Sequence, residues 1–247
     1  MADRLKSALR SAGADLVGYA DLERLDPAAR DNLPFGVSIA VALDPRIVFE
    51  IMNGPTAAYW AEYMRANALL SDLANMATDF LRKQGHTAKP LLPTLASLDT
   101  TAGSSAGYDT ATLSTALPHK TAATLAGLGW IGRCALLVTR EFGSALRLTT
   151  VLTDAALQPG KPVERSRCGT CSRCVDACPA QAVSGNLWES GCRRDSLLDA
   201  AACRSKAHQL TLDRIGVNET ICGICIASCR RTAKYLRRAG LPRYGGQ

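Results

Sequence analysis

The feature that most constrains this chain of 247 residues is one run of cysteines, Cys168-Gly-Thr-Cys171-Ser-Arg-Cys174-Val-Asp-Ala-Cys178-Pro179. The spacing C-x2-C-x2-C-x3-C-P is typical of sequences that bind a [4Fe–4S] cluster. Three closely spaced thiolates can reach three irons of one cluster, and the fourth ligates the other cluster in two-cluster ferredoxins. The run therefore predicts two clusters and requires four further cysteines.

The C-terminal third of the chain supplies these cysteines. Cys222-Gly-Ile-Cys225-Ile-Ala-Ser-Cys229 contributes three, and Cys203 or Cys192 contributes the fourth. We expect Cys203, because it follows Leu-Leu-Asp-Ala-Ala-Ala, a stretch that predicts a helix end with one inward side chain. Cys192 follows a glycine in a looser stretch and is expected to be a free thiol.

The crossover of the fourth cysteine divides the ligands into two sets. Cluster one is assigned Cys168, Cys171, Cys174 and Cys229, and cluster two is assigned Cys178, Cys203, Cys222 and Cys225. The second run is less ideal than the first, because Arg230 follows Cys229 where the first run has a proline. Cys134 lies far upstream and is expected to be a small hydrophobic core residue.

Three other uses of cysteine fit the sequence less well. A structural zinc site commonly pairs two C-x2-C knuckles and has no use for the middle cysteine of the first run. Disulfides belong mainly to small secreted domains, and residues 1–10 contain no apolar signal-peptide segment. Covalent haem needs C-x-x-C-H, and no cysteine here precedes a histidine.

The charge of the chain is less basic than its formal value of +7 suggests. Four thiolates leave an oxidised cluster with about two negative charges, so two clusters would lower the balance by about four. The cations concentrate at the C-terminus, at Arg230, Arg231, Lys234, Arg237, Arg238 and Arg243. They favour either an acidic or phosphate-bearing partner or a solvated helix whose cations suit its C-terminal end.

Hydropathy indicates a soluble protein. Hydrophobic residues make up 47% of the chain, and the longest apolar stretches, such as 37–43, have the length of a strand. They are too short to span a membrane. Together with thiols that survive best in a reducing compartment, this predicts a cytoplasmic protein without a membrane partner.

Periodicity predicts an α/β region at the start of the chain. Residues 1–13 predict a helix, and residues 15–19 and 35–43 predict strands, of which the second is apolar enough to be central. Residues 55–85 predict a long helix that stops at a glycine, and residues 87–92 predict a further strand.

The next segments are shorter. Residues 94–114 are rich in Thr, Ser, Gly and Ala and predict a functional loop. A helix is expected at 121–127, followed by strands at 135–139 and 147–153, and Pro159-Gly160-Lys161-Pro162 indicates a boundary. The predicted domains are an α/β cofactor or substrate domain (1–160), a double-cluster domain (161–232) and a basic tail (233–247).

The stretch Gly127-Leu-Gly129-Trp-Ile-Gly132 matches G-x-G-x-x-G in letters only. A dinucleotide fingerprint needs a strand before it and a helix after it, whereas here a helix precedes and a strand follows. We expect a tight turn that places Trp130 in the core or against a planar ligand.

Together these residues resemble the epoxyqueuosine reductase family of cobalamin-dependent iron–sulfur proteins, which is related to reductive dehalogenases. The matching stretches are Ala126-Gly-Leu-Gly-Trp-Ile-Gly-Arg, Leu148-Thr-Thr-Val-Leu-Thr-Asp and the two cysteine runs. The resemblance is specific after Leu117 and weak before it. It implies a mixed-sheet, corrinoid-reductase-like α/β domain followed by a bacterial ferredoxin-like module with two [4Fe–4S] clusters.

The resemblance also implies site residues. Trp130 and Gly129 would belong to the wall of a cobalamin pocket, and Lys120 and Arg147 would meet the anionic side groups of the corrinoid. Family members carry a proton-donating acid shortly before the Gly-Leu-Gly-Trp turn, where this chain has Leu113-Ser-Thr-Ala-Leu-Pro-His119. His119 is the candidate catalytic acid, because its ordinary pKa lies near neutrality. The alternative is a solvated surface histidine.

Three hypotheses follow. The first is an oxidoreductase that takes electrons from a low-potential donor of the flavodoxin or ferredoxin type and passes them through two clusters to a small-molecule or cofactor acceptor. That acceptor would be cobalamin. The second is a ferredoxin-type electron-transfer subunit without a corrinoid, and the third is a basic RNA-binding module. Transfer RNA is not expected as a substrate, because the helical-repeat domain with which the family grips it is missing.

Overall fold

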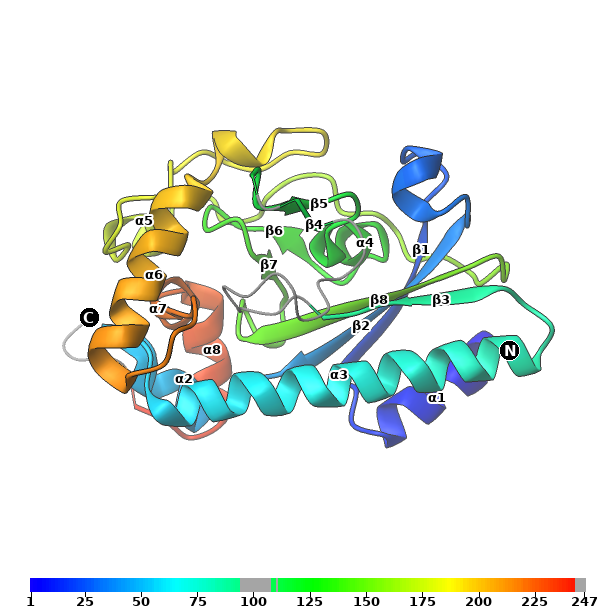
Figure 1. The fold of residues 1–247 in the computed structure, drawn as a ribbon, viewed down its shortest axis with the longest axis horizontal. Helices are drawn as coiled ribbons and strands as arrows, with labels where there is room; N and C mark the ends of the chain where they lie inside the picture. Colours follow the sequence, from blue (N-terminus) through cyan, green and yellow to red (C-terminus); the bar gives the residue numbers. More distant parts are fainter. Residues whose placement is uncertain (94–107, 110, 243–247) are drawn as a thin grey trace.

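The computed structural model describes residues 1–93, 108–109 and 111–242. Its centre is a four-stranded sheet in the order β1-β2-β8-β3 (Figure 1). The strands are β1 (Leu16–Asp21), β2 (Phe35–Ala42), β3 (Ala88–Leu91) and β8 (Leu146–Thr153). β2 is buried over most of its length, as its apolar sequence predicts, because it lies between two neighbours.

The expectation of a mixed sheet is wrong for the described residues, because every neighbouring pair in this sheet is antiparallel. The crossover through α3 (Ala57–Lys83) does leave β2 and β3 pointing the same way. β8 comes later in the chain, inserts between them and pairs antiparallel with both. The fold class is therefore mixed α/β with an antiparallel sheet.

Helices cover both faces of the sheet (Figure 1). α1 (Ala2–Ser11) and α3 pack on one face, and α4 (His119–Leu125) packs on the other beside the hairpin of β6 (Trp130–Ile131) and β7 (Leu137–Val138). The hydroxyl of Thr56 accepts the Tyr59 N–H at 3.1 Å and begins α3.

The expected strands and helices agree with the structure within two residues at each end. The order helix–turn–strand around residues 127–132 is confirmed, because α4 ends before this stretch and β6 follows it. The expected loop at 94–114 lies mostly outside the described residues. Within its described part, β4 (Tyr108–Asp109) pairs with β5 (Ser114–Thr115).

The cysteine-rich region forms short helices at one end of the sheet (Figure 1). They are α5 (Arg173–Asp176), α6 (Ala200–Ile215), α7 (Ile224–Ala227) and α8 (Arg230–Arg238). Four further short elements complete the described fold, η1 (Pro27–Arg30), α2 (Pro45–Glu50), η2 (Ile51–Asn53) and η3 (Arg194–Ser196).

One hydrophobic core runs through both predicted domains. Ile221, Ile226 and Leu236 from the cysteine-rich region are buried in the same cluster as Leu70 of α3 and Ile39 of β2. The removal of this apolar surface from water holds the cysteine-rich helices against the sheet. The division at residues 160 and 232 stays a prediction.

Among the described residues, no helix has the length and apolar character needed to cross a membrane.

Candidate functional site

The two cysteine runs form two loops that pack against each other. Each loop leads into a one-turn helix, α5 after the first and α7 after the second, and these two helices are in contact. Gly223 permits the second loop, because its φ of +84° suits glycine and a Cβ there would come within 2.5 Å of Ile51. All ten cysteines are free thiols in the structure.

Three of the thiols assigned to cluster two lie together. The pKa values of Cys203 and Cys222 are raised, chiefly by burial, and the negative charge of Cys178 adds to both. The backbone N–H of Ala182 donates to the sulfur of Cys178 at 3.4 Å, and the N–H of Ile224 donates to Cys222. These N–H groups favour a thiolate, which is the form that binds iron.

Two of the thiols assigned to cluster one, those of Cys168 and Cys229, share apolar surroundings. Cys229 is the residue before α8, and its sulfur accepts the N–H groups of Arg231 and Thr232. The hydroxyls of Ser144 and Thr232 also donate to it, although burial still raises the pKa of the thiol. Cys168 packs against the same apolar cluster as Cys229.

Cys134 belongs to this group, which sequence reasoning missed. It is buried, as expected, with 4% of its surface exposed. Its sulfur, however, is hydrogen-bonded to those of Cys174 and Cys225. Cys134 and Cys168 both place a sulfur 3.5 Å from the point where a Cβ on Gly132 would lie. No sequence signal was available, since Cys134 is remote from both cysteine runs.

Within the described part of the chain, no three His, Cys, Asp or Glu side chains are grouped closely enough to hold a single metal ion. A [4Fe–4S] cluster binds one thiolate at each of four separate irons. Thiols from both cysteine runs lie near one another here, so cysteine is the donor available to such a group.

Cys192 lies apart from the cluster-two thiols. It packs against the apolar cluster that contains Trp130 and Trp188, and it is near Lys120. Cys203 instead has Cys178 and Cys222 as neighbours. The geometry thus favours Cys203 as the fourth ligand of cluster two.

Two residues expected in the wall of a corrinoid pocket are packed against protein. Trp130 is 2% exposed, and the guanidinium of Arg231 lies 5.4 Å from the centre of its ring. A Cβ on Gly129 would come within 2.3 Å of the Val138 carbonyl oxygen, so only glycine fits at this position. The tight turn predicted here brings Gly129 and Val138 this close together.

The two cations expected to meet the corrinoid are likewise engaged. Lys120 donates from Nζ to the Ala135 carbonyl at 2.7 Å, and burial lowers its pKa. Arg147 donates to the Tyr63 hydroxyl at 2.9 Å and to the Asn67 amide oxygen at 3.1 Å, and it lies over the Tyr63 ring. The role of these four residues toward a corrinoid stays a prediction.

Sequence comparison places this site among known proteins, although no protein-family model matches the chain. Over 186 residues it is 31% identical to a tetrachloroethene reductive dehalogenase of Dehalobacter restrictus, covering 72% of this chain and 30% of the dehalogenase. Over 199 residues it is 30% identical to an epoxyqueuosine reductase of Gloeobacter violaceus, covering 74% of this chain and 60% of that protein. Its homologues are epoxyqueuosine reductases and reductive dehalogenases.

Solved structures of both kinds share the fold. A catabolic reductive dehalogenase in complex with 3-bromo-4-hydroxybenzoic acid superposes with a TM-score of 0.67 at 18% identity, covering 94% of this chain and 33% of the dehalogenase. An epoxyqueuosine reductase with a modified tRNA stem loop gives 0.60 at 18% identity, covering 93% of this chain and 64% of the reductase. The chain thus spans a third to two thirds of these relatives.

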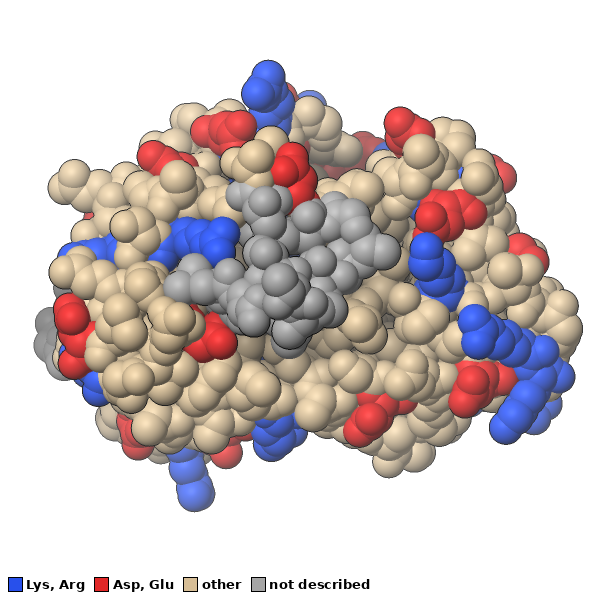
Figure 2. Space-filling view, viewed as in Figure 1, with Lys and Arg blue, Asp and Glu red and all other residues tan. Residues whose placement is uncertain are grey.

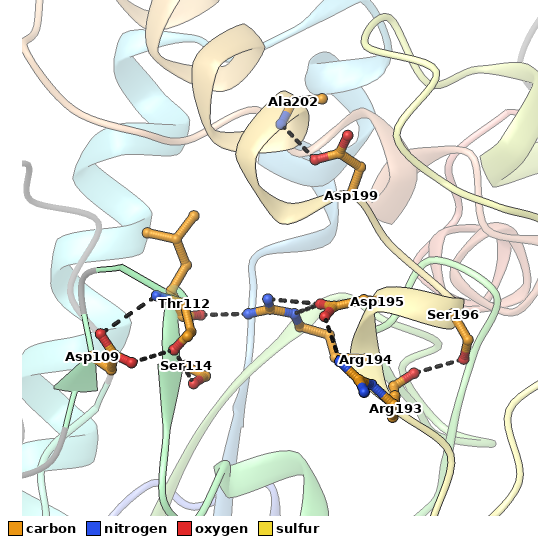
Figure 3. A network of polar contacts seen from close by, with 10 residues as sticks. Asp109, Thr112, Ser114, Arg193, Arg194, Asp195, Ser196, Asp199 and Ala202 are labelled. Atoms are coloured by element: carbon orange, nitrogen blue, oxygen red, sulfur yellow. Dashed lines mark hydrogen bonds and ion pairs between the residues drawn. The ribbon is translucent and has the colours of Figure 1, made fainter.

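The segment that replaces the acid of epoxyqueuosine reductases is anchored to the cysteine-rich region. Arg194 donates to the Leu113 carbonyl at 2.7 Å and also bonds to Asp195 (Figure 3). Asp109 bonds to Thr112 in the same network. These contacts fix the backbone of residues 111–115 beside η3.

His119, the candidate acid, is held from both sides. Nε2 lies 3.0 Å from the Leu92 carbonyl, which only accepts, so Nε2 carries the proton of the neutral ring and Nδ1 accepts from Thr150. Burial is the main cause that lowers its pKa to about 4. A ring with this pKa is neutral at pH 7 and lacks the readily donated proton of an imidazolium, so the catalytic role of His119 stays a prediction that the geometry does not favour.

A group of cations is formed by three residues of α8 and by Arg140, which follows β7. Arg140, Lys234, Arg237 and Arg238 line a shallow depression of about 340 Å³. By contrast, acids and bases are interspersed on the face drawn in Figure 2. We call these four residues the α8 cation group. Cys229 is the residue before α8, so three of the four cations lie on the helix that follows a predicted cluster ligand.

Proposed function

We propose that this chain is an oxidoreductase that carries two [4Fe–4S] clusters and supplies electrons for a reductive reaction. The observation that carries the proposal is that thiols of both cysteine runs lie together, with Cys178 near Cys203 and Cys222, and Cys174 and Cys225 both bonded to Cys134. Cluster one would be held by Cys168, Cys171, Cys174 and Cys229, and cluster two by Cys178, Cys203, Cys222 and Cys225. When bound, each cluster supplies reversible one-electron transfer.

The chain's own residues would prepare these ligands. Cys229 accepts two backbone N–H groups and two hydroxyls, which stabilise the negative sulfur of a ligand. Cys178 and Cys222 each accept one backbone N–H. The surrounding apolar core excludes water, and this desolvation raises the thiol pKa values, so binding of the iron must displace the protons.

A corrinoid is the acceptor that we propose, and relatives support it. One of the solved dehalogenases that share this fold is described as acting in B12-dependent dehalogenation. Because the four residues predicted to contact the corrinoid are engaged with protein, its binding would depend on other residues of the chain. The final substrate would be a small molecule that the reduced cofactor acts upon.

A second candidate is a ferredoxin-type electron-transfer subunit without a corrinoid. The engagement of Lys120 and Arg147 by protein groups favours it. One measurement distinguishes the two candidate functions. Anaerobically purified protein is mixed with cob(II)alamin and passed over a size-exclusion column. Coelution with a changed visible spectrum supports the corrinoid-dependent reductase, and separation supports the subunit.

Iron analysis tests the clusters themselves. Anaerobically prepared protein is expected to be brown and to hold about eight irons and eight sulfides per chain. Cys203→Ala is expected to lose roughly half of this iron. The matched control Cys192→Ala removes a thiol outside both sets and is expected to keep all of it. A colourless protein, or one that holds only zinc, would refute the proposal.

The electron donor would be an acidic low-potential protein of the flavodoxin or ferredoxin type. The α8 cation group offers it a surface of opposite sign next to the segment that carries Cys229. RNA is a less suitable partner for this surface, because Tyr235 is not available to stack on a base. Its ring packs edge-on against Phe142, and its hydroxyl donates to the Leu43 carbonyl at 3.0 Å.

A further inference from the structure

Trp130 carries a buried hydrogen-bond donor that the described chain does not satisfy. Its side chain is 2% exposed, and its Nε1–H has no partner among the described residues. Buried indole N–H groups usually find an acceptor, because leaving one unpaired costs about 1–3 kcal/mol. The apolar cluster around Trp130 includes Cys168 and Cys229, which are both assigned to cluster one. The missing acceptor is thus expected on the side of the cluster-one thiols.

Arg133 approaches the same thiols from the turn that follows β6. One terminal nitrogen donates to the Gly169 carbonyl at 2.7 Å, inside the first cysteine loop. Its Nε is buried and has no partner in the described part of the chain. The positive charge of Arg133 also acts on Cys174 and favours its thiolate form.

Cys134 fixes the position of this short segment. Its sulfur is hydrogen-bonded to that of Cys174, so the chain from Trp130 to Cys134 lies against the first cysteine loop. Gly132 allows this approach, because a Cβ there would come within 2.8 Å of the Val138 side chain and 3.5 Å of the Cys168 sulfur. The segment thus places the indole of Trp130 in the apolar surroundings of Cys168 and the guanidinium of Arg133 near Cys174.

Cluster two has a different environment. Its thiols accept backbone N–H groups from Ala182 and Ile224. The buried phenol of Tyr59 lies near Cys222 and Cys225. The two sites therefore differ in hydrogen bonding and in charge.

We propose that Trp130 and Arg133 are positioning residues that raise the reduction potential of cluster one above that of cluster two. This inference rests on the proposed function. A reduced cluster carries one more negative charge than an oxidised one. Hydrogen bonds to its sulfurs and a nearby cation stabilise that charge and make reduction easier. Electrons entering the pair would then settle on cluster one, the site to which the Trp130–Cys134 segment of the α/β domain is attached.

The test is a redox titration of the holoprotein followed by electron paramagnetic resonance. Trp130→Phe keeps the ring and removes the N–H, and Arg133→Gln removes the charge at a partly exposed position. Each is expected to shift one cluster to a more negative potential and leave the other unchanged, with iron still at the wild-type content. Cys171→Ser alters the signal of cluster one and so identifies which cluster has moved.

Matched controls separate this effect from general disturbance. Trp188→Phe makes the same change at a second buried tryptophan of the same apolar cluster, and Arg10→Gln removes a cation in α1. Both are expected to leave the two potentials unchanged. Iron-loaded Trp130→Phe and Arg133→Gln with wild-type potentials, or with both clusters shifted equally, would overturn the inference and leave the proposed function standing. A wild-type chain that binds no iron would instead refute the proposed function.

Discussion

Asp199 holds Cys203 in place through the first turn of α6. Its backbone carbonyl accepts the N–H of Cys203 at 3.1 Å, and its carboxylate accepts the N–H of Ala202 at 2.9 Å (Figure 3). The carboxylate is thus the N-terminal cap of the helix that presents the proposed fourth ligand of cluster two. A cap that directs a ligand links helix stability to iron binding.

Removing this cap is expected to loosen cluster two. Asp199→Ala should cost about 1 kcal/mol, which lowers the thermal midpoint of the holoprotein by about 2–4 °C for a chain of this size. It should also speed the loss of iron under chelator. Asp213→Ala, in the last turn of the same helix, removes an acid from the end where the helix dipole disfavours it. This control should be neutral or slightly stabilising, and equal losses in both variants would contradict the role of the cap.

His119 is expected to stay neutral through the physiological range. Its pKa of about 4 lies below the ordinary 6.5, so between these values the unfolded chain binds a proton that the folded chain does not. The contribution of the neutral ring to stability is therefore complete above pH 6.5 and is lost as pH falls toward 4. Imidazole resonances are few, since the chain has 3 histidines. An NMR titration with His119→Asn for assignment checks this, and a midpoint near 6.5 would show a solvated ring.

Gly129 is expected to tolerate no side chain. In Gly129→Ala the new Cβ would come within 2.3 Å of the Val138 carbonyl oxygen, and backbone cannot move aside cheaply. Overpacking of this kind costs about 1–3 kcal/mol or more, measurable as a lower urea midpoint. Gly36→Ala is the matched control, because its Cβ would meet only the end of the Leu22 side chain at 3.1 Å. A small effect at Gly129 would mean that β6 and β7 can separate.

The α8 cation group is expected to govern the rate of electron uptake. Lys234→Glu combined with Arg237→Glu should slow reduction by an acidic flavodoxin by tenfold or more at low ionic strength, because steering depends on opposite charge. The difference should shrink as salt is added. Lys83→Glu, at the end of α3, is a charge-reversal control remote from α8 and should have little effect. Stopped-flow absorbance measures the rate, and an unchanged rate would place the donor elsewhere.

Local patterns were sufficient for the strands and helices. The apolar run of β2 and the three- and four-residue steps of α3 depend on burial of one side of an element, which neighbouring residues reveal. The direction of the strands was not available in this way. β8 joins β2 and β3 through pairings far apart in the sequence, so only the fold shows that the sheet is antiparallel.

The candidate site likewise contains residues that local sequence predicted and residues that only the fold brings together. Spacing predicted the proposed ligand cysteines of the two runs, and a local helix pattern added Cys203, because iron–sulfur ligation imposes fixed spacings on short runs. Cys134 reached the same thiols through tertiary packing and left no such mark. Lys120 and Arg147 looked available in the sequence, yet their partners Ala135 and Asn67 come from other parts of the chain. The hydrogen-bond partners of a charged side chain inside the fold cannot be predicted from its neighbours in the sequence.

β8 is synthesised after β2 and β3, and this order has a consequence for folding during biosynthesis. Until residue 153 has left the ribosome, β2 and β3 each lack a neighbour and expose strand edges that invite aggregation. The nascent chain must therefore be shielded over this interval. The first cysteine run emerges only after β8. Synthesis in this order lets the strands of the sheet pair before the proposed ligand cysteines of the two runs are made.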